Sequence, residues 1–298
     1  MPVFELTHAR GAQDERRENH VRTWDDAVNR WRTESKHRAS CTIEREERIL
    51  KWLQPHLTGL LLAHVTRGRL ADIRSSGLAA GWSNRTANYT VGVVSTVMRA
   101  ANEWEWVSSV PRLRSLKLPP HRTRWLTYEE ADRLLDELPQ HLADMARFTL
   151  QTGLRKATLL AMHWDWLDWT QGRECVRVPA PKMKQRRPLI VPLSELALAI
   201  MRRLHSRRAG LRVWMLDGRQ ITEPNTRIWR QALQRAGIDD FTWHDLRHTW
   251  ASWHVQSGTS LAVLKELGGW QTMQMVMVYA HLATRQLFDA VRDMRYQR

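Results

Sequence analysis

The sequence predicts a mainly helical protein with a small β element, divided into two domains. Apolar residues recur at helical spacing over most of the chain, beginning with Trp24 and Trp31. β-branched residues gather in two short segments, 176–178 and 189–191, which is typical of strands. Two prolines and a basic run share residues 117–124, where a helix cannot continue, so we predict a linker there.

The first domain, over residues 21–116, is expected to be entirely helical. It follows a polar segment, residues 1–20, that has little to bury and is predicted to be mobile. Asp25 and Asp26 suit the first turn of its first helix, because the helix dipole favours negative charge there. Further helices are predicted over 43–53, ending before Pro55, from about Leu70, and from Ser83 through Val91, Val94, Val97 and Met98.

The second domain, over residues 125–298, is predicted to combine helices with the small β element. Thr127 precedes two acidic residues, Glu129 and Glu130, which is typical of a helix start. More helices are expected over 142–151 and 193–204, with others toward the end of the chain. A basic turn separates the two predicted strands.

Composition and charge indicate a globular protein that binds a polyanion. The chain is 43% hydrophobic and 26% charged, unlike a disordered segment. Its 46 Lys and Arg against 31 Asp and Glu give a formal charge of +15. Such an excess favours nucleic acid, because each neutralised phosphate releases counterions. The alternative is a basic protein whose arginines are simply solvated.

Other features favour a cytoplasmic protein without a metal or a membrane anchor. Cys41 and Cys175 lie far apart and lack metal-ligand spacing, so neither a disulfide framework nor a metal site is expected. The N-terminus carries charges where a signal peptide needs an apolar core. Apolar runs stay well short of the roughly 18 residues that a membrane span needs.

The reactive side chains suit metal-free cleavage of a phosphodiester. His244 and Arg247 are spaced to share one face of a helix, and Arg155 follows a glycine that allows a turn. Arginine forks bind phosphate oxygens, and Tyr279 can attack as a nucleophile. A phenol with a pKa of roughly 10 needs a nearby base or cation to react. Alone, each element is more often ordinary surface; only the joint pattern is informative.

On these residues, and on three further segments, the chain resembles the tyrosine recombinase (phage integrase) family. Leu267-Gly268-Gly269-Trp270 and Tyr279-Ala280-His281 fall where that family's pattern expects them, and Val191-Pro192-Leu193 follows its catalytic lysine. Trp270 stands where the family usually has a second histidine. Thr158 stands where it commonly has an acidic residue that supports the first arginine. The catalytic lysine corresponds to Lys184, with Lys182 as the alternative.

The resemblance implies a fold and a mechanism. The fold would be a helical core-binding domain followed by a mixed α/β catalytic domain. The enzyme would be a site-specific recombinase or integrase that works through a 3′-phosphotyrosyl intermediate, without metal, ATP or other cofactor. The roles implied are nucleophile for Tyr279, charge stabilisation by Arg155 and Arg247, proton transfer by His244 and Lys184, and phosphate binding by Trp270.

The implied partners are DNA and further copies of the chain. A double-stranded recombination site would be bound by a homo-tetramer on two duplexes, with an accessory directionality factor as a further candidate partner. The C-terminal helix, 284–296, either docks on a neighbouring protomer or packs on its own domain. Candidate DNA contacts are Arg85, Thr86, Asn88, Arg122, Arg124, Arg186 and Arg187. Capping by Ser83 explains part of the first group equally well.

Two alternatives remain open from the sequence. A type IB topoisomerase would share the fold and the nucleophile, but that class generally has lysine in place of His244. The second alternative is a catalytically inactive DNA-binding protein, which the replacement of the usual acidic residue by Thr158 favours. Among recombinases, the segment 103–106 favours a phage-derived integrase over a chromosome-dimer resolvase.

Overall fold

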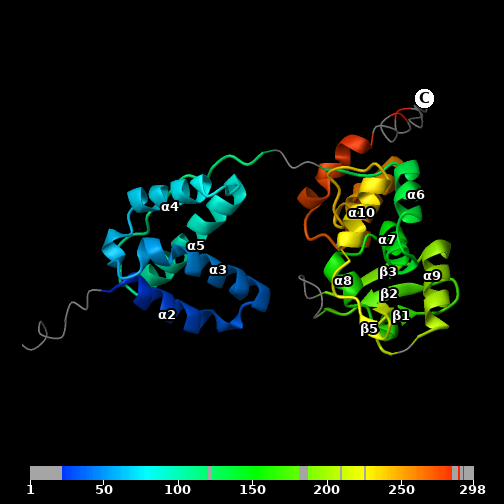
Figure 1. Ribbon diagram of the computed structural model, residues 1–298, viewed down its shortest axis with the longest axis horizontal. Coiled ribbons are helices and arrows are strands. Elements are labelled where there is room, and N and C mark those ends of the chain that lie inside the picture. Colours follow the sequence, from blue (N-terminus) through cyan, green and yellow to red (C-terminus); the bar gives the residue numbers. More distant parts are fainter. Residues whose placement is uncertain are drawn as a thin grey trace, which may run out of the picture. The chain divides into compact units, whose positions relative to one another are not determined.

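The computed structural model describes residues 22–119, 123–180, 187–208, 210–224 and 226–283, together with positions 288 and 291. The chain divides into two compact units, Met1–Pro120 and His121–Arg298 (Figure 1). This division falls inside the predicted linker, 117–124. The expected N-terminal segment, 1–20, lies outside the described residues, as does nearly all of the expected C-terminal helix.

The regular elements described in the first unit are helices, as its apolar spacing predicts. Thr23 caps the first helix with a capping box, in which its hydroxyl accepts from the Asp26 N–H. Its elements are α2 (Trp24–Glu34), η1 (Ser35–His37), α3 (Ser40–Leu57), η2 (Leu62–His64), α4 (Arg67–Ala79) and α5 (Asn84–Glu103).

The structure corrects one helix boundary in this unit. The sequence predicted a helix ending before Pro55, but α3 contains Pro55 and continues to Leu57. Proline costs little here because it sits in the last turn, where few further backbone hydrogen bonds are lost. Leu57 is 1% exposed, so its burial helps to hold this turn in place.

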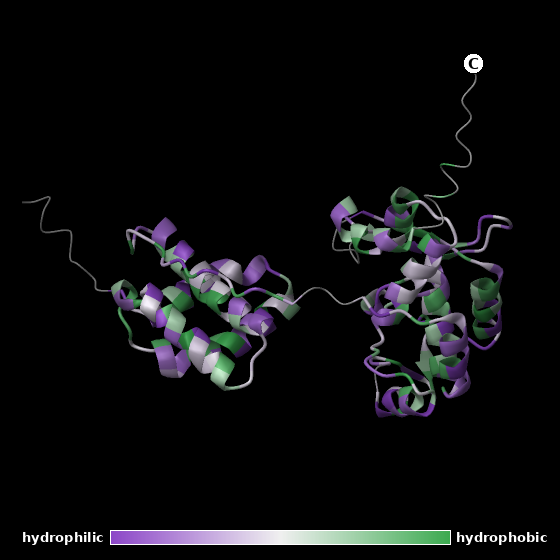
Figure 2. Ribbon diagram, turned by 90° about the horizontal axis from the view of Figure 1, so that it is seen from above, coloured by the Kyte–Doolittle hydropathy of each residue, from purple (hydrophilic) through white to green (hydrophobic). Residues whose placement is uncertain are grey.

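The core of the first unit lies along α5, whose apolar face was predicted from the valine spacing. Figure 2 shows hydrophilic and hydrophobic residues mixed along the helices of both units, as expected of amphipathic helices. The α5 residues pack into one buried cluster with α2, α3 and α4. Its members include Trp24, Trp31, Leu50, Leu53, Leu70, Ile73, Val91, Val94, Val97 and Met98.

The second unit combines helices with short antiparallel strands, which confirms the predicted fold class. Thr127 caps its first helix through a capping box with Glu130, again as predicted. Its helices are α6 (Tyr128–Asp136), α7 (Gln140–Thr152), α8 (Lys156–Leu160), α9 (Glu195–His205), α10 (Arg227–Arg235), α11 (Asp245–Gln256) and α12 (Leu261–Gly268). The described residues also include the 3₁₀ segments η3 (Trp164–Trp166), η5 (Met273–Met275) and η6 (Met277–Leu282).

Both predicted strands are present and pair with each other. They are β2 (Cys175–Val178) and β3 (Leu189–Pro192), with Val176 opposite Val191. A two-residue strand, β1 (Leu167–Asp168), adds to the other edge of β2. A second small pair, β4 (Met215–Leu216) and β5 (Arg219–Gln220), was not predicted.

Two features are absent from the described residues, a membrane-spanning helix and a metal-binding group of side chains. Among them, none is long and apolar enough to cross a membrane. Within the same ranges, no group of three or more His, Cys, Asp or Glu side chains is arranged to hold a metal ion.

Candidate active site

The site is built where α11 packs against α7, α12 and η6. A small buried cluster lies under it, separate from the main core of this unit. Trp250, Trp270 and Tyr279 contribute the aromatic rings of that cluster. Residues that are distant in sequence therefore meet at this packed cluster.

Arg247 occupies the first turn of α11 and is only 4% exposed. Its guanidinium donates one hydrogen bond to the carbonyl oxygen of Gly153 and another, of 2.6 Å, to that of Gly268. Gly153 caps the C-terminus of α7, and Gly268 is the last residue of α12. Two helix C-termini thus face this cation, and their dipoles favour positive charge there.

Arg155 is held by the same end of α12. It precedes α8, and its Nη2 donates to the carbonyl oxygen of Gly269 at 3.1 Å. Thr158, which replaces the family's usual acidic residue, left the support of Arg155 open from the sequence, and this hydrogen bond goes to a backbone carbonyl. Burial lowers the pKa of Arg155. Burial, followed by the charge of Arg155, lowers the pKa of Arg247. Both guanidiniums keep their charge at neutral pH, since free arginine titrates above about 12.

Trp270 lies against Arg247 and lines the site. The guanidinium carbon of Arg247 is 4.1 Å from the centroid of the Trp270 ring, within cation–π range. The indole also stacks on Trp250, with ring centroids 6.0 Å apart. Gly268 makes this position possible, because a Cβ there would lie 1.9 Å from the Trp270 ring. The family pattern predicted Trp270 in the site, and the structure brings it there.

Tyr279 presents the hydroxyl that sequence reasoning selected as nucleophile. It lies in η6, is 1% exposed, and has its ring centroid 6.0 Å from that of Trp270. Burial raises its pKa to about 12, an effect that the positive charge of Arg247 opposes. Because the phenol is harder to ionise than in water, attack requires a group that takes its proton.

His248 supplies a contact that the sequence analysis missed. Its Nδ1 lies 2.6 Å from the hydroxyl oxygen of Tyr279. His244, which the sequence did select, is exposed at the start of α11 and packs its ring at right angles to His248, 5.1 Å away. The signal was available, since positions 244, 247 and 248 follow the i, i+3, i+4 spacing of one helix face.

The predicted lysine lies outside the described residues. Lys184, its alternative Lys182, and the candidate contacts Arg122 and Arg186 all fall in the undescribed ranges. Arg187, which directly follows the undescribed range 181–186 in sequence, lies within the described residues and is exposed. It lies close enough to α12 to help Lys265 lower the pKa of Glu266. α12, whose C-terminal end holds both arginines, also packs against β3, the strand that begins two residues after Arg187.

Arg124 is engaged within the protein. Its guanidinium forms an ion pair of 2.7 Å with Glu130 and also donates to the carbonyl oxygen of Trp125. The hydrogen bond from Arg124 is the main cause that lowers the pKa of Glu130. This pair fixes the chain where it enters α6, so Arg124 has a structural role in this conformation.

The three candidate contacts at the start of α5 differ in their surroundings. Asn88 is half-buried, and its amide exchanges two hydrogen bonds with the backbone of Leu116, of 2.9 and 2.8 Å. It therefore anchors the segment after α5, and its role as a DNA contact stays a prediction. Thr86 pairs with Ser83, whose hydroxyl caps the helix. Arg85 is exposed and stays a candidate contact.

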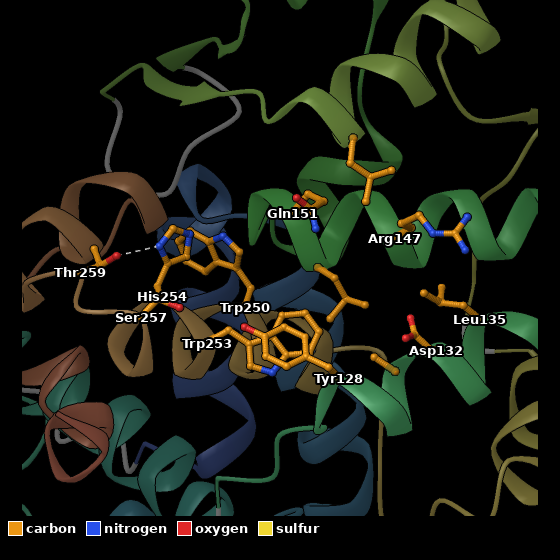
Figure 3. A pocket seen from close by; sticks show the side chains of 13 residues that line it. Tyr128, Asp132, Leu135, Arg147, Gln151, Trp250, Trp253, His254, Ser257 and Thr259 are labelled. Atoms are coloured by element: carbon orange, nitrogen blue, oxygen red, sulfur yellow. Dashed lines mark hydrogen bonds between the residues drawn. The ribbon is translucent and has the colours of Figure 1, made fainter. Parts of the chain in front are cut away.

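A cavity of about 520 Å³ lies on the other side of Trp250 (Figure 3). Tyr128 and Trp253 stack along one of its walls at 4.3 Å, and Thr259 bonds His254 at another. The proposed reactive residues do not line it.

Comparison with known proteins identifies the family. The model of the phage integrase family matches residues 124–286. The chain therefore belongs to the phage integrase family, and it is a tyrosine-type site-specific DNA recombinase. It is 29% identical to the integrase of Salmonella phage P22, over 91% of this chain and 79% of that protein. It is 28% identical to the tyrosine recombinase XerA of Thermococcus kodakarensis, over 82% of this chain and 84% of that one.

Solved structures share the fold. A lambda integrase dimer bound to a COC′ core site matches with a TM-score of 0.75, at 16% identity, over 98% of this chain and 84% of that chain. The Tn1549 transposon integrase in complex with transposon right end DNA matches with a TM-score of 0.77, at 15% identity, over 91% and 100%. The comparisons do not favour the topoisomerase or the inactive-binder alternative.

Proposed function

We propose that Tyr279 is the nucleophile with which this recombinase cuts and rejoins DNA. A lone pair of its oxygen attacks the scissile phosphorus, the bond to the 5′-oxygen breaks, and a 3′-phosphotyrosyl bond remains. The observation that supports this assignment is the placement of one buried hydroxyl near Arg247, which is held by the same helix end as Arg155. The covalent bond conserves the energy of the phosphodiester, so rejoining needs no ATP.

Arg155 and Arg247 stabilise the charge that grows on the phosphate oxygens. Their guanidiniums are already positioned by carbonyl oxygens, so little reorganisation accompanies the reaction. The two arginines thus stabilise charge and Lys184 acts as the acid, which are functions that a metal ion serves in other enzymes. Lys184 protonates the leaving 5′-oxygen, His244 assists proton transfer, and the indole N–H of Trp270 donates to a phosphate oxygen.

The assembly we propose is a homo-tetramer on two duplexes of a double-stranded recombination site. A formal charge of +15 suits this partner. The chain also matches the fold of a lambda integrase tetramer bound to a Holliday junction, with a TM-score of 0.74. Exposed Arg85 and Arg187 are candidate backbone contacts. An integrase role in the cytoplasm, with an accessory directionality factor, completes the proposal.

Trapping the covalent intermediate tests the nucleophile. Wild type, Tyr279→Phe and Tyr128→Phe are incubated with a labelled nicked duplex that the protein binds, and the products are separated in SDS. Tyr128 is a matched control because it is 57% exposed and lies outside the site. We expect an adduct with wild type and Tyr128→Phe only. An adduct with Tyr279→Phe, or none with wild type on DNA that it binds, would contradict the proposal.

A further inference from the structure

We infer that His248, and not His244, accepts the proton of Tyr279 when the hydroxyl attacks the phosphate. This inference rests on the proposed role of Tyr279 as nucleophile and adds a group to the reaction. It concerns a residue one position after Arg247 that the sequence pattern did not select. Its basis is the contact between Nδ1 and the phenolic oxygen.

The surroundings of Tyr279 leave few routes for its proton. The side chain is 1% exposed, so bulk water has little access to the ring. Its neighbours Arg247 and Trp270 can donate hydrogen bonds but cannot accept a proton at neutral pH. The nearby carboxylate of Asp245 accepts hydrogen bonds from the N–H and the hydroxyl of Thr242. An imidazole is different, because one nitrogen of the neutral ring accepts. At 2.6 Å from the phenolic oxygen, Nδ1 of His248 is within direct transfer distance.

The position of His248 is fixed by the helix that also holds Arg247. Arg247 and His248 are neighbours on one broad face of α11, where Arg247 bonds the ends of α7 and α12 and His248 contacts Tyr279 of η6. The exposed His244 packs edge-on against His248. This order places His248 between Tyr279 and His244, and leaves His244 on the solvent side.

The proton balance is simple. Neutral His248 carries its hydrogen on Nε2 and takes the phenolic proton on Nδ1 as the new oxygen–phosphorus bond forms. The bond to the 5′-oxygen breaks, and that oxygen receives a separate proton from the acid. In the rejoining step, the 5′-hydroxyl returns its proton to the acid that supplied it and attacks the phosphotyrosine, and His248 returns its proton to the leaving phenolate. The raised pKa of Tyr279, about 12, agrees with a need for such an acceptor.

Replacement by asparagine separates proton transfer from positioning. His248→Asn keeps a polar group near Nδ1 but cannot accept a proton. His254→Asn is the matched control, since His254 lies on the same helix and its Nδ1 bonds the Thr259 hydroxyl at 3.0 Å. We expect adduct formation to slow by at least about 100-fold in His248→Asn, with DNA binding retained. The rate of adduct formation by His254→Asn, divided by the fraction of that variant that is folded, should equal the wild-type rate.

A more acidic nucleophile provides the decisive readout. Fluorinated tyrosine is incorporated at position 279 in wild type and in His248→Asn, and cleavage rates are compared. A fluorinated phenol loses its proton more easily, so it should partly compensate for the loss of His248. If His248 takes the proton, the ratio of the fluorinated to the unfluorinated cleavage rate should be roughly tenfold larger in His248→Asn than in wild type. A structural role would give no such difference.

Two outcomes would overturn the inference: a wild-type rate for His248→Asn, or a slow rate that fluorination does not improve. Should the asparagine variant fail to fold, His248→Gln takes its place in both measurements. Peptide mapping of the adduct distinguishes this failure from that of the proposed function. A slow adduct on Tyr279 retains the nucleophile, whereas an adduct elsewhere rejects it.

Discussion

Gly153 joins two features of the site, and replacing it by alanine should damage both. Its backbone is left-handed, with φ of +60°, a conformation that costs alanine roughly 1–2 kcal/mol. An added Cβ would also lie 2.1 Å from the ring of Trp250, which is 3% exposed and cannot move freely. Overpacking of this kind typically costs about 1–3 kcal/mol. Together these effects should destabilise the second unit by roughly 2–5 kcal/mol.

Gly172→Ala is the control that separates strain from overlap. Gly172 is also left-handed, with φ of +77°, but no atom lies within 4 Å of its Cβ position. In thermal unfolding, about 1 kcal/mol shifts the transition of a domain of this size by roughly 2–4 °C. We therefore expect Gly153→Ala to lower the transition of the second unit by several degrees more than Gly172→Ala does. It should also slow cleavage, because Gly153 holds Arg247. Equal shifts, with unchanged cleavage, would refute the reasoning.

Two further predictions address charged groups. Arg247→Lys should retain DNA binding in a mobility-shift assay but form the adduct about 100- to 1,000-fold more slowly. The reason is that an ammonium cannot bond two carbonyl oxygens and also bind phosphate as a fork. A rate that falls by less than about threefold would count against this role. Arg124 lowers the pKa of Glu130 below 4.5, so the folded state binds fewer protons than the unfolded state as pH falls through that region. The stability that this ionised carboxylate contributes is present above the unfolded pKa and is lost as pH falls through the folded one. Melting temperatures from about pH 6 to pH 3 should therefore fall less steeply in Glu130→Gln than in wild type, and parallel curves would exclude the effect.

Much of the fold was predictable because its signals are local. Capping residues such as Thr127 and the valine spacing along α5 lie within single elements, and so does the strand pair β2 and β3. The two-residue strands β4 and β5 were not predicted, because two residues are too few to show a periodicity. Pro55 was overinterpreted, since a proline signal alone does not reveal where the last turn of a helix lies.

The sequence predicted most of the reactive side chains of the site, but it did not predict the residues that hold them in place. Arg247, Trp270 and Tyr279 meet as the family pattern implies. The contact of His248 with Tyr279 joins positions 31 residues apart, and its distance depends on how η6 packs against α11. The role of Asn88 as an anchor depends on a chain segment 28 residues away. The assignment of Lys184 stays a prediction.

The backbone support of the arginines has a consequence for phosphate binding. Where Thr158 stands, the family commonly has a carboxylate, which would hold an arginine and at the same time offset its charge. Here Gly153, Gly268 and Gly269 hold the two guanidiniums through carbonyl dipoles, which orient a cation without neutralising it. Burial and, after it, repulsion by the charge of Arg155 lower the pKa of Arg247. A phosphate relieves that repulsion and restores the charge balance of a partly buried site. Supporting the arginines by carbonyls instead of acids therefore directs their full charge to the DNA.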